Sequence, residues 1–223
     1  MTATFINEYF YAYAVTPELL DQLLARGWRH FGVYFYRYSQ DNYGGQERRV
    51  LPVRVHLPTF KPGKTQRRVW RKNADLRYQV RPALLDHTKH ELFARHKLRF
   101  THNIPDTIYE FLSEEPASIP TECREICVYD EEKLVAASFL DIGEKSVSTI
   151  YGMFAPEYNA RSLGLYTMLC EIEYAQKLGI NYYYHGYCHE VPSFYDYKKR
   201  FSGLQRLDWK TETWQEWKAS NYD

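Results

Sequence analysis

The chain has 223 residues, of which 44% are hydrophobic and 26% charged; this composition indicates a globular protein and excludes disordered, collagen-like and coiled-coil chains. No apolar run approaches the roughly 18 residues of a membrane span, and no basic stretch precedes an apolar one at the N-terminus, so we expect no membrane span and no signal peptide. Four cysteines are too few for a disulfide scaffold, which predicts reduced thiols in the cytoplasm: Cys123, Cys127, Cys170 and Cys188.

The net charge of +1 is the sum of two opposite blocks. Residues 47–81 carry eleven Lys and Arg against two acids, a net charge of +9. Residues 106–145 carry eleven acids against three basic residues, a net charge of −8. The basic block would attract a phosphate backbone through the release of counterions. The alternative is that the two blocks face each other across a domain interface.

The first expected element is a helix that begins after Thr16, which can cap it, with Pro17 in its first turn and Gly27 just past its end. Alternating apolar and Tyr residues at 29–37 then predict a strand, and residues 50–57 predict a second one.

A break rich in Pro and Gly precedes residues 64–73, whose pattern predicts a helix with its cations on one side. Residues 75–81 predict a third strand. Pro82 is expected to open a long helix that runs to about residue 100, and residues 104–113 predict a shorter one.

The second half has a β-β-β-α-β order. Three β-rich runs at 123–130, 133–142 and 146–154 predict an antiparallel meander, residues 160–179 predict an amphipathic helix, and residues 180–187 predict a buried strand. We therefore expect an α+β protein with a smaller N-terminal α+β region at 1–81. The rest, 82–223, is expected to be a domain with an antiparallel or mixed sheet flanked by helices.

The loop at 157–164 lies between a predicted strand and a helix N-terminus, where unpaired N–H groups favour an anion. It resembles the acyl-donor loop of the Gcn5-related acetyltransferase fold, although Gly164 is its single glycine. This resemblance implies an acetyltransferase-like fold for the C-terminal domain.

Three further features could carry chemistry. His185, Cys188 and His189 are metal-ligand types, but no second cluster at zinc spacing accompanies them, so we expect core or site-lining residues and no metal site. Asp141 ends an apolar strand and could act as a base in a cleft, or it could form a turn before Gly143. Six tyrosines near the last predicted strand can stack on nucleotide bases or simply pack: Tyr182, Tyr183, Tyr184, Tyr187, Tyr195 and Tyr197.

Several segments, in the same order along the chain, are similar to the family of arginyl-tRNA–protein transferases and bacterial aspartate/glutamate leucyltransferases. The similarity extends from about residue 27 to residue 209. It rests on GWRHFG at 27–32, YR at 36–37, LPVRV at 51–55, QRRVWRKNADL at 66–76, the run from APEY to HGY at 155–187, and the closing YK..F of Tyr197, Lys198 and Phe201.

The resemblance implies an aminoacyltransferase that takes arginine or leucine from aminoacyl-tRNA. The acceptor would be the α-amine of a protein that begins with Asp or Glu, which marks that protein for the N-degron pathway. Which of the two amino acids is donated depends on the shape of a pocket that the sequence does not reveal. The alternatives are tRNA-dependent transfer to a small-molecule or other amine, and a tRNA-binding homologue without catalytic activity.

Two departures from the family pattern matter. Family members carry cysteines between the YR and PVRV segments, and residues 38–51 here have none, so we expect no iron–sulfur cluster and no other cofactor. Family members often have Lys-Met ahead of YK, where this chain has Phe194 and Tyr195. This change concerns how the acceptor is recognised.

The donor is an activated ester, so an amine can attack it directly, and the enzyme has to position the amine, remove a proton and stabilise the oxyanion. We expect Asp141 or Tyr151 to orient the attacking amine. Lys198, with Arg161 second, would pair with the carboxylate of the acceptor or with a phosphate, and Tyr187 and Tyr197 would line the substrate site. The tRNA acceptor end would be held by Gln66, Arg67, Arg68, Arg71 and Lys72.

Overall fold

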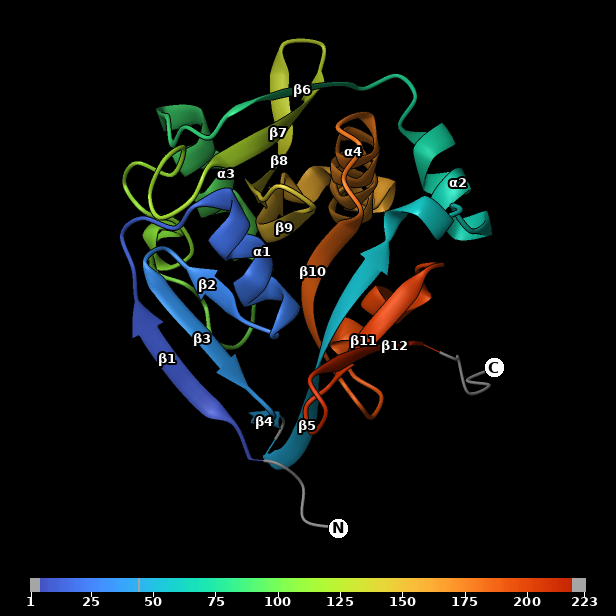
Figure 1. Cartoon of the computed structure of the whole chain (residues 1–223). Coiled ribbons are helices and arrows are strands. Elements are labelled where there is room, and N and C mark those ends of the chain that lie inside the picture. The colour runs from blue at the N-terminus through green and yellow to red at the C-terminus, as the bar shows by residue number, and fades with distance from the viewer. Residues whose placement is uncertain (1–4, 44, 218–223) are drawn as a thin grey trace.

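The computed structural model describes residues 5–43 and 45–217, and within them the strands form two sheets (Figure 1). The small sheet is antiparallel and has the order β1-β3-β2, with β1 at Asn7–Tyr11, β2 at Arg29–Phe31 and β3 at Tyr34–Tyr38.

The large sheet has the order β12-β11-β5-β10-β9-β8-β7-β6, and β4 also pairs with β5. Only β9 and β10 are parallel neighbours among the described strands; this pairing needs a crossover, which α4 (Leu163–Lys177) supplies. The strands are β4 (Gln40–Tyr43), β5 (Gln46–His56), β6 (Arg77–Pro82), β7 (Cys123–Asp130), β8 (Lys133–Ile142), β9 (Ser146–Phe154), β10 (Tyr182–His189), β11 (Leu204–Asp208) and β12 (Thr213–Glu216).

The meander β7-β8-β9, followed by α4 and β10, confirms the expected β-β-β-α-β order and the α+β class with a mixed sheet flanked by helices. The boundary expected between residues 81 and 82 falls in the last residues of β6. Strands from both sides of that boundary share the large sheet, because β5 pairs with β10 and with β11.

The first helix, α1 (Pro17–Ala25), confirms the expectation for this segment, since the Thr16 side chain accepts a hydrogen bond from the N–H of Leu19. The cationic helix α2 (Lys64–Lys72) also lies where it was expected. The short 3-10 helices are η1 (Leu57–Thr59), η2 (Ile108–Glu110), η3 (Pro156–Arg161) and η4 (Phe194–Arg200).

Three expected elements are wrong in extent. Residues 29–37 form a hairpin instead of one strand, because Gly32, at φ 50°, turns the chain between β2 and β3. The helix expected from Pro82 begins at α3 (His87–Lys97), because Pro82 still pairs in β6 and the Asp86 side chain caps α3 by accepting from the N–H of Lys89 at 3.1 Å. The helix expected at 104–113 is reduced to η2.

Two helices cover opposite faces of the β7–β8 part of the sheet. On the α4 side, Ile126 and Ala136 belong to a buried apolar cluster that includes Ile172 of α4. On the α3 side, Ala137 packs with Phe93 in a second cluster. Helix α1 lies between the small sheet and β10, where it contributes to a further cluster. No helix among the described residues is long and apolar enough to cross a membrane.

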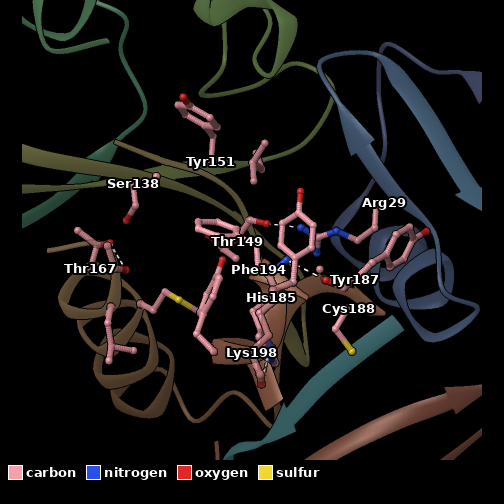
Figure 2. A pocket seen from close by; sticks show the side chains of 18 of the residues that line it. Arg29, Ser138, Thr149, Tyr151, Thr167, His185, Tyr187, Cys188, Phe194 and Lys198 are labelled. Atoms are coloured by element: carbon pink, nitrogen blue, oxygen red, sulfur yellow. Dashed lines mark hydrogen bonds between the residues drawn. The ribbon is translucent and has the colours of Figure 1, made fainter. Parts of the chain in front are cut away.

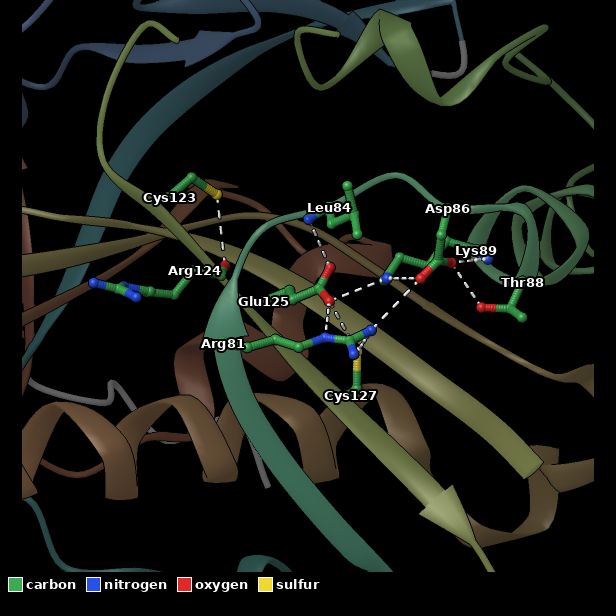
Figure 3. A network of polar contacts seen from close by, with 9 residues as sticks. All are labelled: Arg81, Leu84, Asp86, Thr88, Lys89, Cys123, Arg124, Glu125 and Cys127. Carbon is green, nitrogen blue, oxygen red and sulfur yellow. Dashed lines mark hydrogen bonds and ion pairs between the residues drawn. The ribbon is translucent and has the colours of Figure 1, made fainter. Parts of the chain in front are cut away.

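A buried charge network joins α3 to β6 and β7 (Figure 3). The carboxylate of Glu125 accepts from Nε of Arg81 at 2.5 Å and lies 3.0 Å from Nζ of Lys89, which also pairs with Asp86 at 2.8 Å. The side chains of Glu125 and Lys89 are fully buried. Both buried charges are therefore tolerated in the interior because each is paired with two groups of opposite charge.

Candidate active site

A cavity of about 630 Å³ lies between the small sheet, the large sheet and α4, and is called the main cavity below. Its walls come from β2, β3, β9, α4, β10 and η4, so residues far apart in the chain meet there (Figure 2). Four expected site residues line it together: Tyr151, Tyr187, Tyr197 and Lys198.

Lys198 of η4 lines the main cavity, and its amine lies beside a bulge in β10. The register between β10 and β5 shifts between Tyr184 and Gly186, and Gly186 has φ 98°. A Cβ at Gly186 would lie 2.9 Å from Nζ of Lys198, so the amine would have to move from this position if another residue replaced the glycine. Nζ donates a hydrogen bond to the carbonyl of Tyr187 at 3.0 Å. Burial, reinforced by the Arg29 guanidinium, lowers the pKa of Lys198 to about 7.

Arg29 extends from β2 to the cavity wall, where backbone and hydroxyl oxygens hold its guanidinium (Figure 2). It donates to Oγ of Ser148 at 2.8 Å, to the carbonyl of Tyr184 at 3.3 Å and to the carbonyl of Thr149. These three contacts fix a nearly buried cation at one place in the wall.

Glu171 of α4 places a fully buried carboxylate in the wall of the same cavity. Its Oε2 accepts from the hydroxyl of Tyr183 at 2.5 Å, and its Oε1 accepts from Oγ1 of Thr149 at 3.2 Å. Burial raises the pKa of Glu171 to about 7. This carboxyl group is therefore able to exchange a proton near neutral pH.

Two aromatic groups near the cavity are polar but neutral. The Tyr151 hydroxyl is buried and makes no hydrogen bond within the described residues. The Tyr151 ring stacks on that of Phe111, with 4.1 Å between the ring centroids. Burial raises the pKa of Tyr151. Nδ1 of His96 accepts from the N–H of Phe154 at 3.0 Å, and burial lowers the pKa of His96 to about 4. The Tyr151 hydroxyl is thus a donor that a bound substrate can use.

Two expected site residues lie outside the main cavity. Asp141, expected as a base, is fully buried; it accepts from Oγ1 of Thr121 at 2.5 Å and lies 2.8 Å from Nε2 of His30. This contact ties β8 to β2. Arg161, expected to meet a carboxylate or a phosphate, donates from both terminal nitrogens to Asp75, at 2.8 Å each. Both residues hold segments of the fold together.

A second cavity, of about 440 Å³, lies between α2 and the outer side of α4. Gln66, Arg67 and Arg71 line it, beside the ring of Trp70. The side chain of Gln66 is buried and engaged, since its Oε1 accepts from the N–H of Gly63 at 2.7 Å in the cap of α2.

Two other residues expected to bind tRNA are also exposed on α2 but do not line this cavity. Arg68 faces solvent, and Lys72 donates to the carbonyl of Ala160 at 2.5 Å. Among the described residues, the cations of α2 make no ion pair with the acidic block. The ion pairs between the two blocks come from β6 instead, through Arg77 and Arg81.

Sequence reasoning missed Arg29, Thr149 and Glu171. For Glu171 a signal existed, because it follows Leu163 and Thr167 at four-residue spacing on the buried face of α4, where a carboxylate is unexpected. Arg29 and Thr149 carried no local signal, since their contact joins positions 120 residues apart in sequence.

Comparison with known proteins gives matches over nearly the whole chain. Residues 3–68 match the family model described as arginine-tRNA-protein transferase, N terminus, and residues 88–208 match the one described as arginine-tRNA-protein transferase, C terminus.

Two curated relatives are named aspartate/glutamate leucyltransferase. The one from Marinobacter nauticus is 32% identical over 86% of this chain and 81% of its own length. The one from Alcanivorax borkumensis is 30% identical over 90% of this chain and 83% of its own length. Among solved structures, FemX is similar with a TM-score of 0.49 and 13% identity, over 81% of this chain and 64% of that one.

Proposed function

Because the chain belongs to the arginine-tRNA–protein transferase family, it is an aminoacyltransferase, and we propose that it moves arginine or leucine from aminoacyl-tRNA to the α-amine of proteins that begin with Asp or Glu. One observation carries the proposal. The main cavity, of about 630 Å³, is lined both by a carboxyl group, Glu171, and by an amine, Lys198, and burial brings the pKa of each to about 7.

The chemistry needs no covalent intermediate. The amine nitrogen forms a bond to the carbonyl carbon of the ester, and the bond from that carbon to the terminal ribose oxygen breaks. An α-amine has a pKa near 7.7–8.0, so on the order of a tenth of it is already neutral at pH 7. The site has to position this amine, take one proton from it and return a proton to the ribose oxygen.

Glu171 supplies the proton acceptor in this proposal, with Thr149 between it and the substrate. Oγ1 of Thr149 takes a proton from the attacking amine while its own proton passes to Oε1 of Glu171, along the 3.2 Å hydrogen bond. The hydroxyl of Tyr183 orients the carboxylate from the other side. When the ester bond breaks, the same path returns the proton to the ribose oxygen. Asp141 has no role in this path, because its carboxylate is engaged by His30 and Thr121.

Lys198 is the group proposed to recognise the acidic side chain of the acceptor. Its amine lies in the cavity wall beside Tyr187 and Tyr197, and Arg29 contributes a second positive charge nearby. A carboxylate that enters the cavity would restore the charge of Lys198, because an ion pair favours the protonated amine. Tyr151 would donate its unpartnered hydroxyl to the oxyanion that forms during attack.

The exposed cations of α2, which include Arg67, Arg68, Arg71 and Lys72, are proposed to bind the phosphates of the tRNA. Gln66 holds the first turn of α2 in place. We also propose that no iron–sulfur cluster takes part, because the segment between YR and PVRV lacks cysteine and the four cysteines of the chain are individually buried elsewhere. The cytoplasm, where charged tRNA is made, is the proposed location.

The proposal is tested by incubating the protein with Arg-tRNA or Leu-tRNA and a peptide that begins with Asp or Glu. Mass spectrometry of the peptide is expected to show the added mass of one arginine or one leucine, and a matched peptide that begins with Ser is expected to stay unmodified. Transfer to a small amine alone would favour the first alternative. Tight tRNA binding with no transfer to any amine would favour a non-catalytic homologue and contradict the proposal.

A further inference from the structure

One face of the small sheet carries a row of tyrosines, called the tyrosine ladder below: Tyr9, Tyr11, Tyr34, Tyr36 and Tyr38. The last three alternate along β3, and the register pairs Tyr9 with Tyr36 and Tyr11 with Tyr34 across β1. Neighbouring ring centroids are 5.3 Å apart for Tyr11–Tyr34, 5.6 Å for Tyr9–Tyr34, 5.8 Å for Tyr34–Tyr36 and 5.9 Å for Tyr36–Tyr38. The rings therefore form one continuous aromatic surface.

The ladder begins inside the main cavity and ends in solvent. Tyr36 and Tyr38 line the cavity. The ring of Tyr187 is T-shaped to both of them, with centroid distances of 6.2 Å to Tyr36 and 5.1 Å to Tyr38. Tyr9 and Tyr11 are each 64% exposed, although each presents a large aromatic ring. A molecule that leaves the cavity along the small sheet would pass directly over these rings.

Packing of the fold does not account for the outer rings. The opposite face of the same sheet carries Phe10 and Phe35, which stack on each other and pack with Leu20 and Leu24 of α1. That face already joins the small sheet to the rest of the protein. Contiguous exposed apolar surface of this kind is typical of an interaction site.

The charges of the strands that carry the ladder do not oppose a polyanion. The strand residues on its face are neutral apart from Arg29, which is cationic and lies beside Tyr36 in the register of β2 and β3. The carboxylate of Glu8 belongs to the other face, where it accepts from Nε of Arg37 at 2.7 Å. A phosphate backbone can therefore cross the tyrosine ladder without meeting a carboxylate from these strands.

We propose that the tyrosine ladder stacks the unpaired bases at the 3′ end of the donor tRNA and leads its aminoacyl group into the main cavity. The inference rests on the proposed function only for the identity of the RNA. Tyrosine suits this task because every base has a flat face, so stacking tolerates any sequence and contributes about 1–3 kcal/mol per base. Tyr9, Tyr11 and Tyr34 hold the bases outside, and Tyr36 and Tyr38 meet the terminal nucleoside.

The test compares Tyr9→Ser/Tyr11→Ser with Tyr9→Phe/Tyr11→Phe in steady-state transfer. The serine variant is expected to raise the KM for aminoacyl-tRNA about tenfold or more, as the loss of one stacked base predicts, with kcat and the acceptor KM unchanged. The phenylalanine variant keeps the rings and is expected to behave as wild type. Tyr109→Ser, at an exposed tyrosine beside His90 of α3, is the matched control and is expected to change nothing.

A binding measurement separates this inference from the proposed function. A labelled RNA of four unpaired nucleotides with the 3′-terminal sequence of tRNA is titrated with each protein, and fluorescence anisotropy gives its Kd without any transfer. A Kd about tenfold weaker for the serine variant alone supports the ladder even if no amino acid is transferred. Equal Kd values for wild type and the serine variant would contradict the proposal that the tyrosine ladder binds RNA, and would leave the proposed function unaffected.

Two further outcomes would also overturn the inference. The first is a rise in the acceptor KM instead of the tRNA KM, which would assign the tyrosine ladder to the acceptor protein. The second concerns a tRNA that carries 2-aminopurine at its unpaired 3′ end. If the fluorescence of this base is the same in the free tRNA and in the complex with wild-type protein, the base does not stack on the tyrosines. This last measurement needs no variant, so it holds even if the serine variant folds poorly.

Discussion

Oγ1 of Thr149 lies 3.2 Å from Oε1 of Glu171, and this contact joins the surface of the main cavity to a buried carboxylate on another element. Thr149 comes from β9 and Glu171 from α4, which pack against each other. The arrangement keeps the carboxylate dry, which raises its pKa to about 7, and still gives it a hydrogen-bonded path to the cavity. A base of this kind is half ionised at the pH where an α-amine begins to be neutral.

Glu171→Gln is expected to lower kcat about 100-fold or more, which is the usual contribution of a general base, with the KM for aminoacyl-tRNA unchanged. In wild type the rate should rise more steeply with pH below about 7 than above it, because Glu171 accepts a proton only after it ionises, while the neutral fraction of the acceptor amine increases up to about pH 8. The variant should keep only the shallower rise that the amine causes. A stopped-flow single-turnover pH profile measures this. Glu144→Gln, an exposed acid in the β8–β9 turn, is the control, and an unchanged profile in Glu171→Gln would refute the role.

Lys198→Met is expected to raise the KM for an acceptor that begins with Asp or Glu about tenfold, since a charged hydrogen bond contributes about 1.5–3 kcal/mol. The pKa of Lys198 is lowered to about 7, so in the free enzyme its charge is present below that pH and lost above it. The acceptor KM of wild type should therefore increase above pH 7. Lys199→Met, whose amine pairs with Asp196 at 2.8 Å, is the control.

Gly186→Ala is a second way to test the same lysine. The new Cβ would occupy the space next to Nζ of Lys198 and would also strain a residue at φ 98°. We expect the acceptor KM to rise as in Lys198→Met, with tRNA binding retained. Wild-type kinetics in Gly186→Ala would mean that the position of the Lys198 amine is unimportant.

Arg67→Glu/Arg71→Glu is expected to weaken tRNA binding. The slope of log Kd plotted against log salt concentration should also decrease by about two, because each lost phosphate contact releases about 0.9 of a counterion less. Filter binding between 50 and 200 mM salt provides the slope. The control is Arg77→Glu/Arg95→Glu, which reverses two cations that are already paired with Glu132 and Glu157. Equal slopes in the two variants would argue against α2 as the tRNA surface.

Lys89→Met is expected to destabilise the fold by about 1.5–3 kcal/mol, because it removes one of the two cations that hold the buried Glu125 carboxylate and leaves Arg81 as its partner. Urea unfolding at pH 7 measures the loss. Lys89→Met/Glu125→Leu should recover most of it, since no charge then stays unpaired in the interior. Lys177→Met, at an exposed lysine paired with Glu173 along α4, should cost less than about 0.5 kcal/mol.

Local sequence patterns predicted several elements well. Thr16 and Pro17 marked the start of α1, and the alternating runs in the second half marked β7, β8 and β9. These features depend on caps and on side-chain periodicity, which act between residues a few positions apart. The hairpin at 29–37 was missed because its turn depends on the positive φ of Gly32, which periodicity does not reveal.

The sequence by itself determined the family, the order of the secondary structure and the position of the basic helix. Tertiary structure alone decided which side chains share the main cavity. It joined Tyr151, Tyr187 and Lys198, added Arg29 and Glu171, and excluded Asp141, whose carboxylate the distant His30 engages. The physical reason is that the pKa and reach of each group depend on burial and on partners over 100 residues away in the chain, and these exist only once β2, β9, α4 and β10 have packed together.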